Sequence, residues 1–217
     1  MCSVEYAVIA VAGLGSRLGL GKPKCLVEIE GHPIIHYQLE LLKDVPNIRL
    51  VVGFEEHEVF QVVKKIRPDV VFVRNPSFRS TTTLDSYSIG ANYVDKQCLF
   101  MDGDIIFEPN SFQKFLDDCA TENMLVGITK AKTDDAVYAL LDNENGKINR
   151  FSRTEKSDYE WANIVWVPPN YFISKNSAVY EFLQDDLPLP ACVVNSYEVD
   201  TVTDFERAKA YVNSLAK

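Results

Sequence analysis

Apolar runs alternate with segments of helical period along about the first 130 residues of the chain. Runs rich in Val, Ile and Leu predict strands near residues 6–11, 48–52, 70–73, 97–101 and 124–129. Between them, apolar residues recur every three or four positions, which predicts helices over residues 33–43, 56–66, 83–93 and 111–119. Strands that alternate with helices form βαβ units, so this half predicts a mostly parallel sheet covered by helices.

After about residue 130 the pattern becomes richer in strands. The stretch AVYALLDNENGKINRF predicts a hairpin with its turn at Asn145-Gly146, since these residue types adopt the positive φ angles of a tight turn. The stretch IVWVPPNYFI predicts a strand that ends at the two prolines. A helix, a strand and a last helix follow, near residues 177–183, 192–199 and 202–215. We therefore expect an α/β fold, with one three-layer α/β/α domain and a mixed, mostly parallel sheet over residues 1–217.

Charge and cysteine content narrow the partners and the compartment. The 217 residues carry a formal net charge of −9, and a negative field of that size repels nucleic acid and anionic membranes. The apolar run near the N-terminus is short and follows Glu5, which fits neither a signal peptide nor a membrane span. The five cysteines are scattered without a C-x-x-C pair, as is typical of a reduced cytoplasmic chain. The sequence leaves open whether the chain forms a homo-oligomer.

The stretch AGLGSRLGLGKPKCLVEIEG, directly after the first predicted strand, is a cationic island in this acidic chain. It contains Arg17, Lys22 and Lys24, and no acidic residue occurs between Glu5 and Glu28. Neither of the two common phosphate-loop patterns, G-x-G-x-x-G and G-x-x-x-x-G-K-[ST], fits in full. A glycine-rich turn still exposes backbone N–H groups that can line an anion. We therefore predict a loop that binds a polyphosphate through Ala12, Gly13, Leu14, Gly15 and Ser16.

This stretch resembles the opening of nucleotidyltransferases that use a nucleoside triphosphate to activate a phosphorylated small molecule. Their pattern Gly-x-Gly-x-Arg, then Pro-Lys, is matched by Gly13, Gly15, Arg17, Pro23 and Lys24. Later features of the family follow in the same order, at Asn75-Pro76, Gly103-Asp104 and Asp200-Thr201. The phrases PKCLVEIEGHPIIHYQLELL and NPSFRSTTTLDSYSIGANYV are most similar to the phosphocholine and phosphonate cytidylyltransferase branch. The resemblance implies the nucleotidyltransferase fold, which is GT-A-like and Rossmann-like.

The resemblance also implies a reaction, in which an acceptor phosphate attacks the α-phosphorus of the triphosphate and pyrophosphate leaves. A phosphate monoester has its second pKa near about 6, so it is already largely dianionic and needs no general base. Arg17 and Lys24 are the expected catalytic cations, and Asp104 and Asp200 the expected ligands of Mg²⁺. CTP is the expected donor. The branch often has paired asparagines where this chain has three threonines, at residues 81–83, so the base stays open.

Recognition of the two substrates is expected to divide between the halves of the chain. The nucleotide is expected within about residues 1–130, near Asp102, with Thr83 and Ser86 as donors to the base unless they cap a helix. The acceptor is expected within about residues 131–217. There, Lys156 is predicted to hold its phosphate. The aromatic residues predicted to wall its head group, unless they pack in the core, are Tyr159, Trp161 and Tyr197.

Several alternatives remain at this stage. A sugar-1-phosphate nucleotidylyltransferase shares the same motifs, and Asp102-Gly103-Asp104 matches the D-x-D pattern of glycosyltransferases. A non-catalytic nucleotide-binding module is a further alternative. His32 and His36 have the spacing of helical zinc ligands, but no third ligand is apparent in the sequence. Cys25 lies beside Lys24, yet the following LVEI favours packing over a nucleophilic role.

Overall fold

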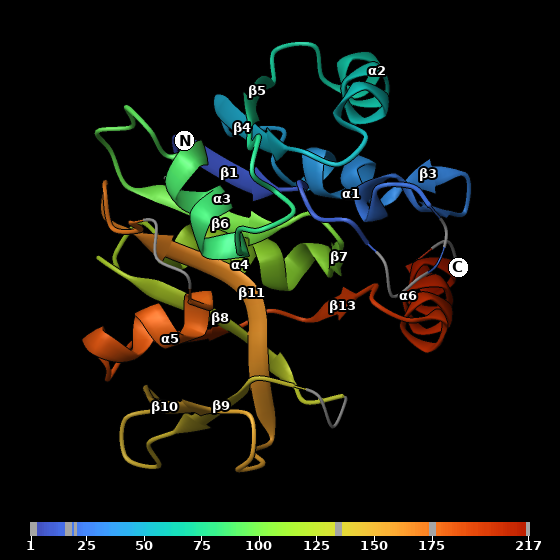
Figure 1. Cartoon of the computed structure of the whole chain (residues 1–217). Helices are drawn as coiled ribbons and strands as arrows, with labels where there is room; N and C mark the ends of the chain where they lie inside the picture. The colour runs from blue at the N-terminus through green and yellow to red at the C-terminus, as the bar shows by residue number, and fades with distance from the viewer. Residues whose placement is uncertain (1–3, 16–18, 20, 133–135, 174–176, 216–217) are drawn as a thin grey trace.

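The computed structural model of the chain describes residues 4–15, 19, 21–132, 136–173 and 177–215. Within these residues, a sheet of nine strands runs through the molecule in the order β10-β9-β11-β6-β1-β4-β5, with β8 and β12 paired beside β11 (Figure 1). Two short two-stranded sheets, β13-β7 and β2-β3, lie outside it. Strands from both halves of the sequence therefore contribute to one large sheet.

The centre of the large sheet is parallel. β1 (Tyr6–Ala10) lies between β4 (Asn47–Val52) and β6 (Cys98–Asp102), and β5 (Val71–Arg74) pairs in parallel with the far side of β4. The first three of these strands read as nearly continuous apolar runs because helices cover both faces of the sheet. Four of the five strands predicted in this half are thus confirmed here in a parallel arrangement, and the fifth, near residues 124–129, pairs antiparallel with a strand of the second half.

Helices on both faces give the three predicted layers (Figure 1). One hydrophobic cluster includes side chains of α1 (Ile34–Leu41), α2 (Glu56–Ile66) and α4 (Pro109–Asp118). A second cluster includes side chains of α3 (Thr83–Gly90) and α5 (Val179–Leu183). Successive side chains along each central strand point alternately into the first and the second cluster, because side chains of a strand alternate between the two faces of the sheet.

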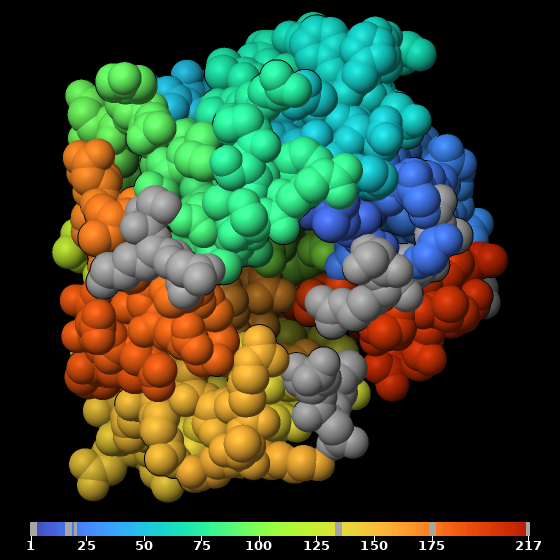
Figure 2. All heavy atoms as spheres, in the orientation of Figure 1, coloured from blue at the N-terminus to red at the C-terminus, as the bar shows by residue number. Residues whose placement is uncertain are grey.

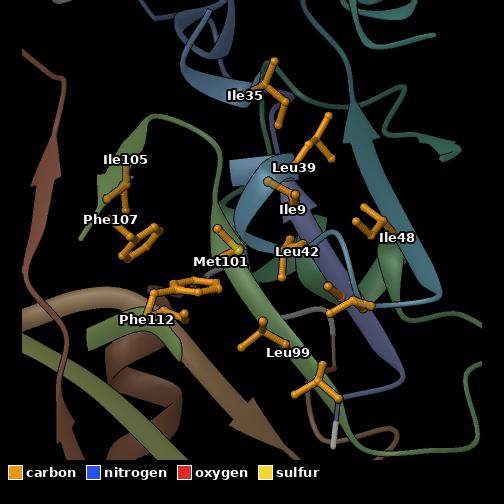
Figure 3. Close-up of a cluster of buried hydrophobic side chains, with 14 of the residues drawn as sticks. Ile9, Ile35, Leu39, Leu42, Ile48, Leu99, Met101, Ile105, Phe107 and Phe112 are labelled. Carbon is orange, nitrogen blue, oxygen red and sulfur yellow. The ribbon is translucent and has the colours of Figure 1, made fainter. Parts of the chain in front are cut away.

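Figure 3 shows the first cluster at the centre of the molecule. Ile35 and Leu39 of α1 point toward Ile9 of β1 and Met101 of β6. All four side chains are at most 3% exposed. Burying an aliphatic side chain of this size contributes about 1.5–3 kcal/mol each, so this packing fixes α1 against the central strands.

The second half is mostly antiparallel. The long strand β11 (Tyr159–Val167) pairs with β6, with β8 (Leu125–Lys130) and, at one end, with β9 (Tyr138–Leu141). β9 and β10 (Ile148–Ser152) form the predicted hairpin. Its turn contains Gly146 at φ +70°, as the Asn-Gly signal predicts.

The predicted strand 192–199 is wrong as a single element. The segment divides into β12 (Ala191–Val193), which pairs in parallel with β8, and β13 (Ser196–Glu198), which pairs with β7 (Ile105–Phe107). The chain leaves the large sheet between them, where the Asn195 carbonyl accepts a hydrogen bond from the Glu108 amide at 2.8 Å. This change of sheet carries the end of β13 to the carboxyl end of β6.

Two helix boundaries also differ from the expectation. α1 begins at Ile34, because residues His32–Pro33 form β3 against β2 (Glu28–Ile29). His32 therefore lies outside the helix. The helix expected over residues 83–93 ends at Gly90. The last helix, α6 (Val202–Leu215), agrees with the prediction and packs through Ala208 and Val212 on a third cluster beside β2 and β7.

Candidate active site

The loop after β1 lies at the carboxyl end of the parallel strands, where open α/β sheets bind ligands. Gly15 has φ +61°, and a Cβ atom on it would lie 2.9 Å from Cγ of Lys24. The stem of Lys24 therefore passes close to the Gly15 backbone, and any larger residue at position 15 would both strain the turn and displace the lysine. The loop glycine thus positions the cation that the sequence analysis assigned to catalysis.

The ammonium of Lys24 lies between two carboxylates. It donates to Oδ2 of Asp104 at 2.8 Å and to Oδ1 of Asp200. All three side chains are less than a fifth exposed, so their charges interact more strongly than surface charges do. The Val199 amide donates to the Asp104 carbonyl at 2.9 Å, and this backbone contact brings together two aspartates that lie far apart in the sequence.

Glu198 adds a third carboxylate that the sequence analysis missed. Carboxylate oxygens of Asp104, Glu198 and Asp200 lie within 4.8 Å of one another. Glu198 is the last residue of β13 and Asp200 follows it by two residues, and this spacing of two beside a strand was the available signal. Converging carboxylate oxygens are the ligands that Mg²⁺ prefers, so these residues fit a magnesium site.

Asp102 has a different environment from Asp104. Its Oδ1 accepts a hydrogen bond from the buried Tyr87 hydroxyl at 2.7 Å. Burial raises the pKa of the Asp102 carboxyl well above its usual range, and the nearby Asp104 carboxylate raises it further. The Tyr87 hydrogen bond lowers this pKa but does not offset burial.

Gln38 holds the turn between β6 and β7, a role that its sequence position did not reveal. Its side-chain amide is fully buried and donates to the carbonyls of Asp102 and Ile105 at 2.8 and 2.9 Å. These two carbonyls flank the turn that carries Asp104. Gln38 therefore supports the geometry of the carboxylates from α1.

The loop and the carboxylates line a cavity of about 330 Å³. The predicted nucleotide-binding residues that line it are Ala12, Gly13, Leu14, Gly15, Thr83, Ser86 and Asp102. Ser16 and Arg17, predicted for the same site, lie outside the described residues. The structure thus brings together every predicted nucleotide-side residue that it describes.

The start of α3 forms one wall of this cavity, and its residues have separate roles. Thr82 is the N-cap residue, and its amide and hydroxyl both donate to Oδ2 of Asp85, at 2.8 and 3.0 Å. Cap formation therefore uses Thr82 and not Thr83 or Ser86. The buried amide of Asn75 donates to Oγ of Ser86 at 3.2 Å and fixes that hydroxyl at the cavity edge.

A larger cavity of about 690 Å³ adjoins the first and shares Thr83, Asp102, Glu198 and Asp200 with it. Figure 2 shows the surface hollowed between the orange segment of α5, the yellow β9–β10 region and the red α6. Trp161 and Tyr197, two of the aromatic residues expected near the acceptor, both line this cavity. Lys156 and Tyr159 are absent from the described residues that line either cavity.

The ring of Tyr197 is already engaged by two neighbours. It stacks on Tyr211, with centroids 4.5 Å apart, and the ammonium of Lys132 lies 4.8 Å from its centroid. A cationic head group at this ring would meet the charge of Lys132. This geometry disfavours a cationic head group against the ring of Tyr197, which was expected to wall the head group of the acceptor.

The two minor alternatives are not supported by the geometry. The Cys25 thiol is buried, and burial raises its pKa strongly, so the thiolate form needed of a nucleophile is disfavoured. The rings of His32 and His36 stack with centroids 4.4 Å apart. Among the described residues, the one cluster of three potential metal ligands consists of Asp104, Glu198 and Asp200, and it contains no histidine.

The chain is similar in sequence to several known proteins. The chain is 33% identical over 110 residues, or 48% of its length, to CMP-5'-(3-aminopropyl)phosphonate synthase of Streptomyces rubellomurinus, and the match covers 18% of that protein. It is 26% identical over 82% of its length to a bifunctional sugar-1-phosphate nucleotidylyltransferase/acetyltransferase of Sulfurisphaera tokodaii, covering 41% of that protein. The chain thus spans less than half the length of these curated relatives.

Among solved structures, the fold is similar to that of CTP:phosphocholine cytidylyltransferase from Streptococcus pneumoniae. The TM-score is 0.77 at 19% identity, and the match covers 95% of this chain and 98% of the other. No helix within the described residues is both long enough and apolar enough to span a membrane. The family model of the MobA-like NTP transferase domain matches residues 7–158, about two thirds of the chain. The chain therefore belongs to the MobA-like NTP transferase domain family, a family of nucleotidyltransferases.

Proposed function

We propose that the chain transfers a nucleoside monophosphate, CMP from CTP, onto a phosphorylated small molecule and releases pyrophosphate. The observation that carries this proposal is the convergence of Lys24 with Asp104 and Asp200 at a cavity lined by the glycine loop. A cation beside paired carboxylates suits a reaction in which two anionic groups must approach each other.

The glycine loop, Lys24 and the carboxylates of the first cavity have separate parts in the proposed reaction. The backbone of the glycine loop provides N–H groups for the triphosphate, and Lys24 provides a point charge near the α-phosphate. Asp104, Glu198 and Asp200 would hold Mg²⁺, which supplies positive charge against the phosphates when bound. Arg17, outside the described residues, is proposed as a second cation on the phosphates.

The acceptor is proposed to enter through the larger cavity. This cavity shares Asp200 and Glu198 with the first, so a phosphate placed at the junction can reach the α-phosphorus. An acceptor phosphate is already largely dianionic at neutral pH, so its attack requires orientation and charge neutralisation but no general base. The site contains no histidine among its described lining residues, in agreement with that requirement.

CTP is favoured as the donor by the sequence resemblance to the cytidylyltransferase branch and by the name of the Streptomyces rubellomurinus relative. Base recognition is assigned to the start of the glycine loop with Thr83 and Ser86. A sugar-1-phosphate nucleotidylyltransferase is the second candidate, supported by the relative from Sulfurisphaera tokodaii. A D-x-D glycosyltransferase or a non-catalytic module accounts less well for the buried Lys24 between two carboxylates.

The direct test is pyrophosphate release in the presence of magnesium. CTP, UTP, GTP and ATP are each combined with phosphocholine, 2-aminoethylphosphonate and several sugar 1-phosphates. Release that depends on CTP and on an acceptor supports the proposal, and release with another base reassigns the donor. Release that persists in EDTA contradicts the magnesium assignment. Silence across the grid, in protein that binds a triphosphate, favours the non-catalytic alternative.

A further inference from the structure

The larger cavity has a charge pattern that the sequence analysis did not assign. Away from the shared carboxylates, its described lining residues include three cations and two anions, namely Lys132, Arg153, Arg207, Glu160 and Asp204. Among these described residues the cations outnumber the anions by one, in a chain whose formal net charge is −9. A local excess of cations in an acidic protein indicates an anionic guest.

Lys132 is the most constrained of these cations. Its ammonium donates to Oγ1 of Thr129 at 3.0 Å and to the carbonyl of Ser196, and it lies near the ring of Tyr197. An ammonium has three donors, so two are used by neutral acceptors within the described part of the chain. No carboxylate of a described residue lies within 4 Å of it. Burial lowers the pKa of Lys132, the nearby Glu160 carboxylate raises it, and the charge of Arg207 lowers it again.

Arg207 also lacks a strong internal partner among the described residues. Its contact with Oδ1 of Asp204 is long, at 3.4 Å, and its side chain is 46% exposed. Asp204 mainly caps α6, since its other carboxylate oxygen accepts from the amide and hydroxyl of Thr201 at 3.1 and 2.7 Å. Lys132 and Arg207 are thus two cations that face one cavity and repel each other, an arrangement that an anion bound between them would stabilise.

The position of Lys132 sets which part of the acceptor it can reach. Ser196, which its ammonium contacts, precedes Glu198 by two residues in β13, a separation of about 7 Å in a strand. The carboxylates of the reaction centre lie at or beyond Glu198. Lys132 therefore faces the distal end of an acceptor whose phosphate lies at the junction of the two cavities.

We propose that the acceptor carries a second anionic group, a carboxylate or a phosphate, at the end remote from its reacting phosphate or phosphonate. Lys132 and Arg207 bind this distal group. The inference rests on the proposed function for the position of the reacting phosphate. It excludes a quaternary amine as the preferred tail, because such a tail would meet the ammonium of Lys132 beside Tyr197.

The experiment compares acceptors that differ in the charge of the tail. Dissociation constants of 3-phosphoglycerate, glycerol bisphosphate, glycerol 3-phosphate and phosphocholine are measured by calorimetry, and the same four compounds are tested for CTP-dependent pyrophosphate release. We expect 3-phosphoglycerate and glycerol bisphosphate, which carry a second anionic group, to bind at least about tenfold more tightly than the other two, as a hydrogen-bonded charge pair provides. Whichever of the two binds more tightly identifies the distal group as carboxylate or phosphate.

Variants assign the effect to the two cations. Lys132→Met is expected to remove most of the preference for the compounds with a second anionic group, and Arg207→Gln part of it. Arg207 is half exposed, so its substitution tests the inference even if Lys132→Met fails to fold. Lys130→Met, which changes an exposed lysine of β8 outside the cavity, is expected to leave the preference unchanged.

The outcomes separate this inference from the proposed function. A binding preference that depends on Lys132, without pyrophosphate release from CTP in the presence of any of the four compounds, retains the anionic pocket and contradicts the proposed transferase. Pyrophosphate release with equal binding of all four compounds, or with tightest binding of phosphocholine, overturns the inference and leaves the transferase intact. A preference that survives both cation variants also overturns the inference.

Discussion

The two cavities of this chain differ in how their linings are built. The smaller one is formed by the backbone of the glycine loop, the start of α3 and a compact group of carboxylates around Lys24. The larger one is formed largely by side chains from β8, β11, β13, α5 and α6, with charges of both signs. All nucleoside triphosphates present the same phosphate groups, which few residues can bind. Acceptors differ in structure, so each requires its own set of binding residues. Under the proposed function, the residues of the first cavity would bind the triphosphate and those of the second would select the acceptor.

The largest expected effect comes from the carboxylates of the first cavity. Asp104→Asn removes one negative ligand of the proposed metal site while preserving shape, and we expect turnover with every acceptor to fall by at least about 10²-fold. Pyrophosphate release measures the rate, and circular dichroism checks the fold. Asp95→Asn changes an exposed aspartate and serves as the matched control. Full activity of Asp104→Asn would remove it from the reaction centre.

Lys24→Met tests whether the first cavity acts on the reaction and not on acceptor choice. We expect kcat to fall by about 10²-fold, because the charge near the α-phosphate is lost. The KM for the acceptor is expected to change little, since Lys24 does not line the larger cavity. Steady-state kinetics with varied acceptor separates the two parameters. A large rise in acceptor KM with unchanged kcat would assign Lys24 to the acceptor instead.

Gly15→Ala tests the contact between the loop and Lys24. Both Gly15 and Gly21 have positive φ angles, +61° and +64°, so alanine strains the backbone at either position. At Gly15 the added Cβ also meets Lys24, whereas at Gly21 it meets nothing within 4 Å. We therefore expect a loss of kcat of about tenfold for Gly15→Ala, well beyond that of Gly21→Ala. Equal losses would show that backbone strain alone matters.

Gln38→Leu is expected to have the smallest effect on the rate and a clear effect on stability. It leaves the carbonyls of Asp102 and Ile105 without their buried donor, so the free energy of unfolding should fall by about 1–3 kcal/mol. Urea denaturation measures this change. Gln113→Leu, at an exposed position of α4, is the control. Unchanged stability would mean that the turn before β7 does not depend on α1.

Much of the fold could be predicted because its local signals agree with its tertiary environment. The central strands are continuous apolar runs, and such runs fit a sheet that is covered on both faces. The segment after Ala191 misled the prediction because its β-propensity is uniform while its pairing partners change. β12 adds to the large sheet and β13 to β7, and propensity carries no information on which partner a strand finds.

The candidate site divides in the same way. The glycine loop, Lys24, Asp104 and Asp200 were named from the sequence, and the structure brings together those of them that it describes. Glu198 and Gln38 were missed, since a glutamate near the end of a short strand and a glutamine on a helix have many ordinary roles. Lys156 was chosen for the acceptor, yet the described cations of the larger cavity are Lys132, Arg153 and Arg207.

The sequence by itself determined the α/β class and the cationic loop, because these depend on local pattern and residue type. Only the tertiary structure decided that β13 reaches β7, that Glu198 joins the two aspartates and that Lys132 and Arg207 face one cavity. Those relations join residues that are distant in the chain. Long-range pairing and packing set them, and no local signal in the sequence encodes such distances.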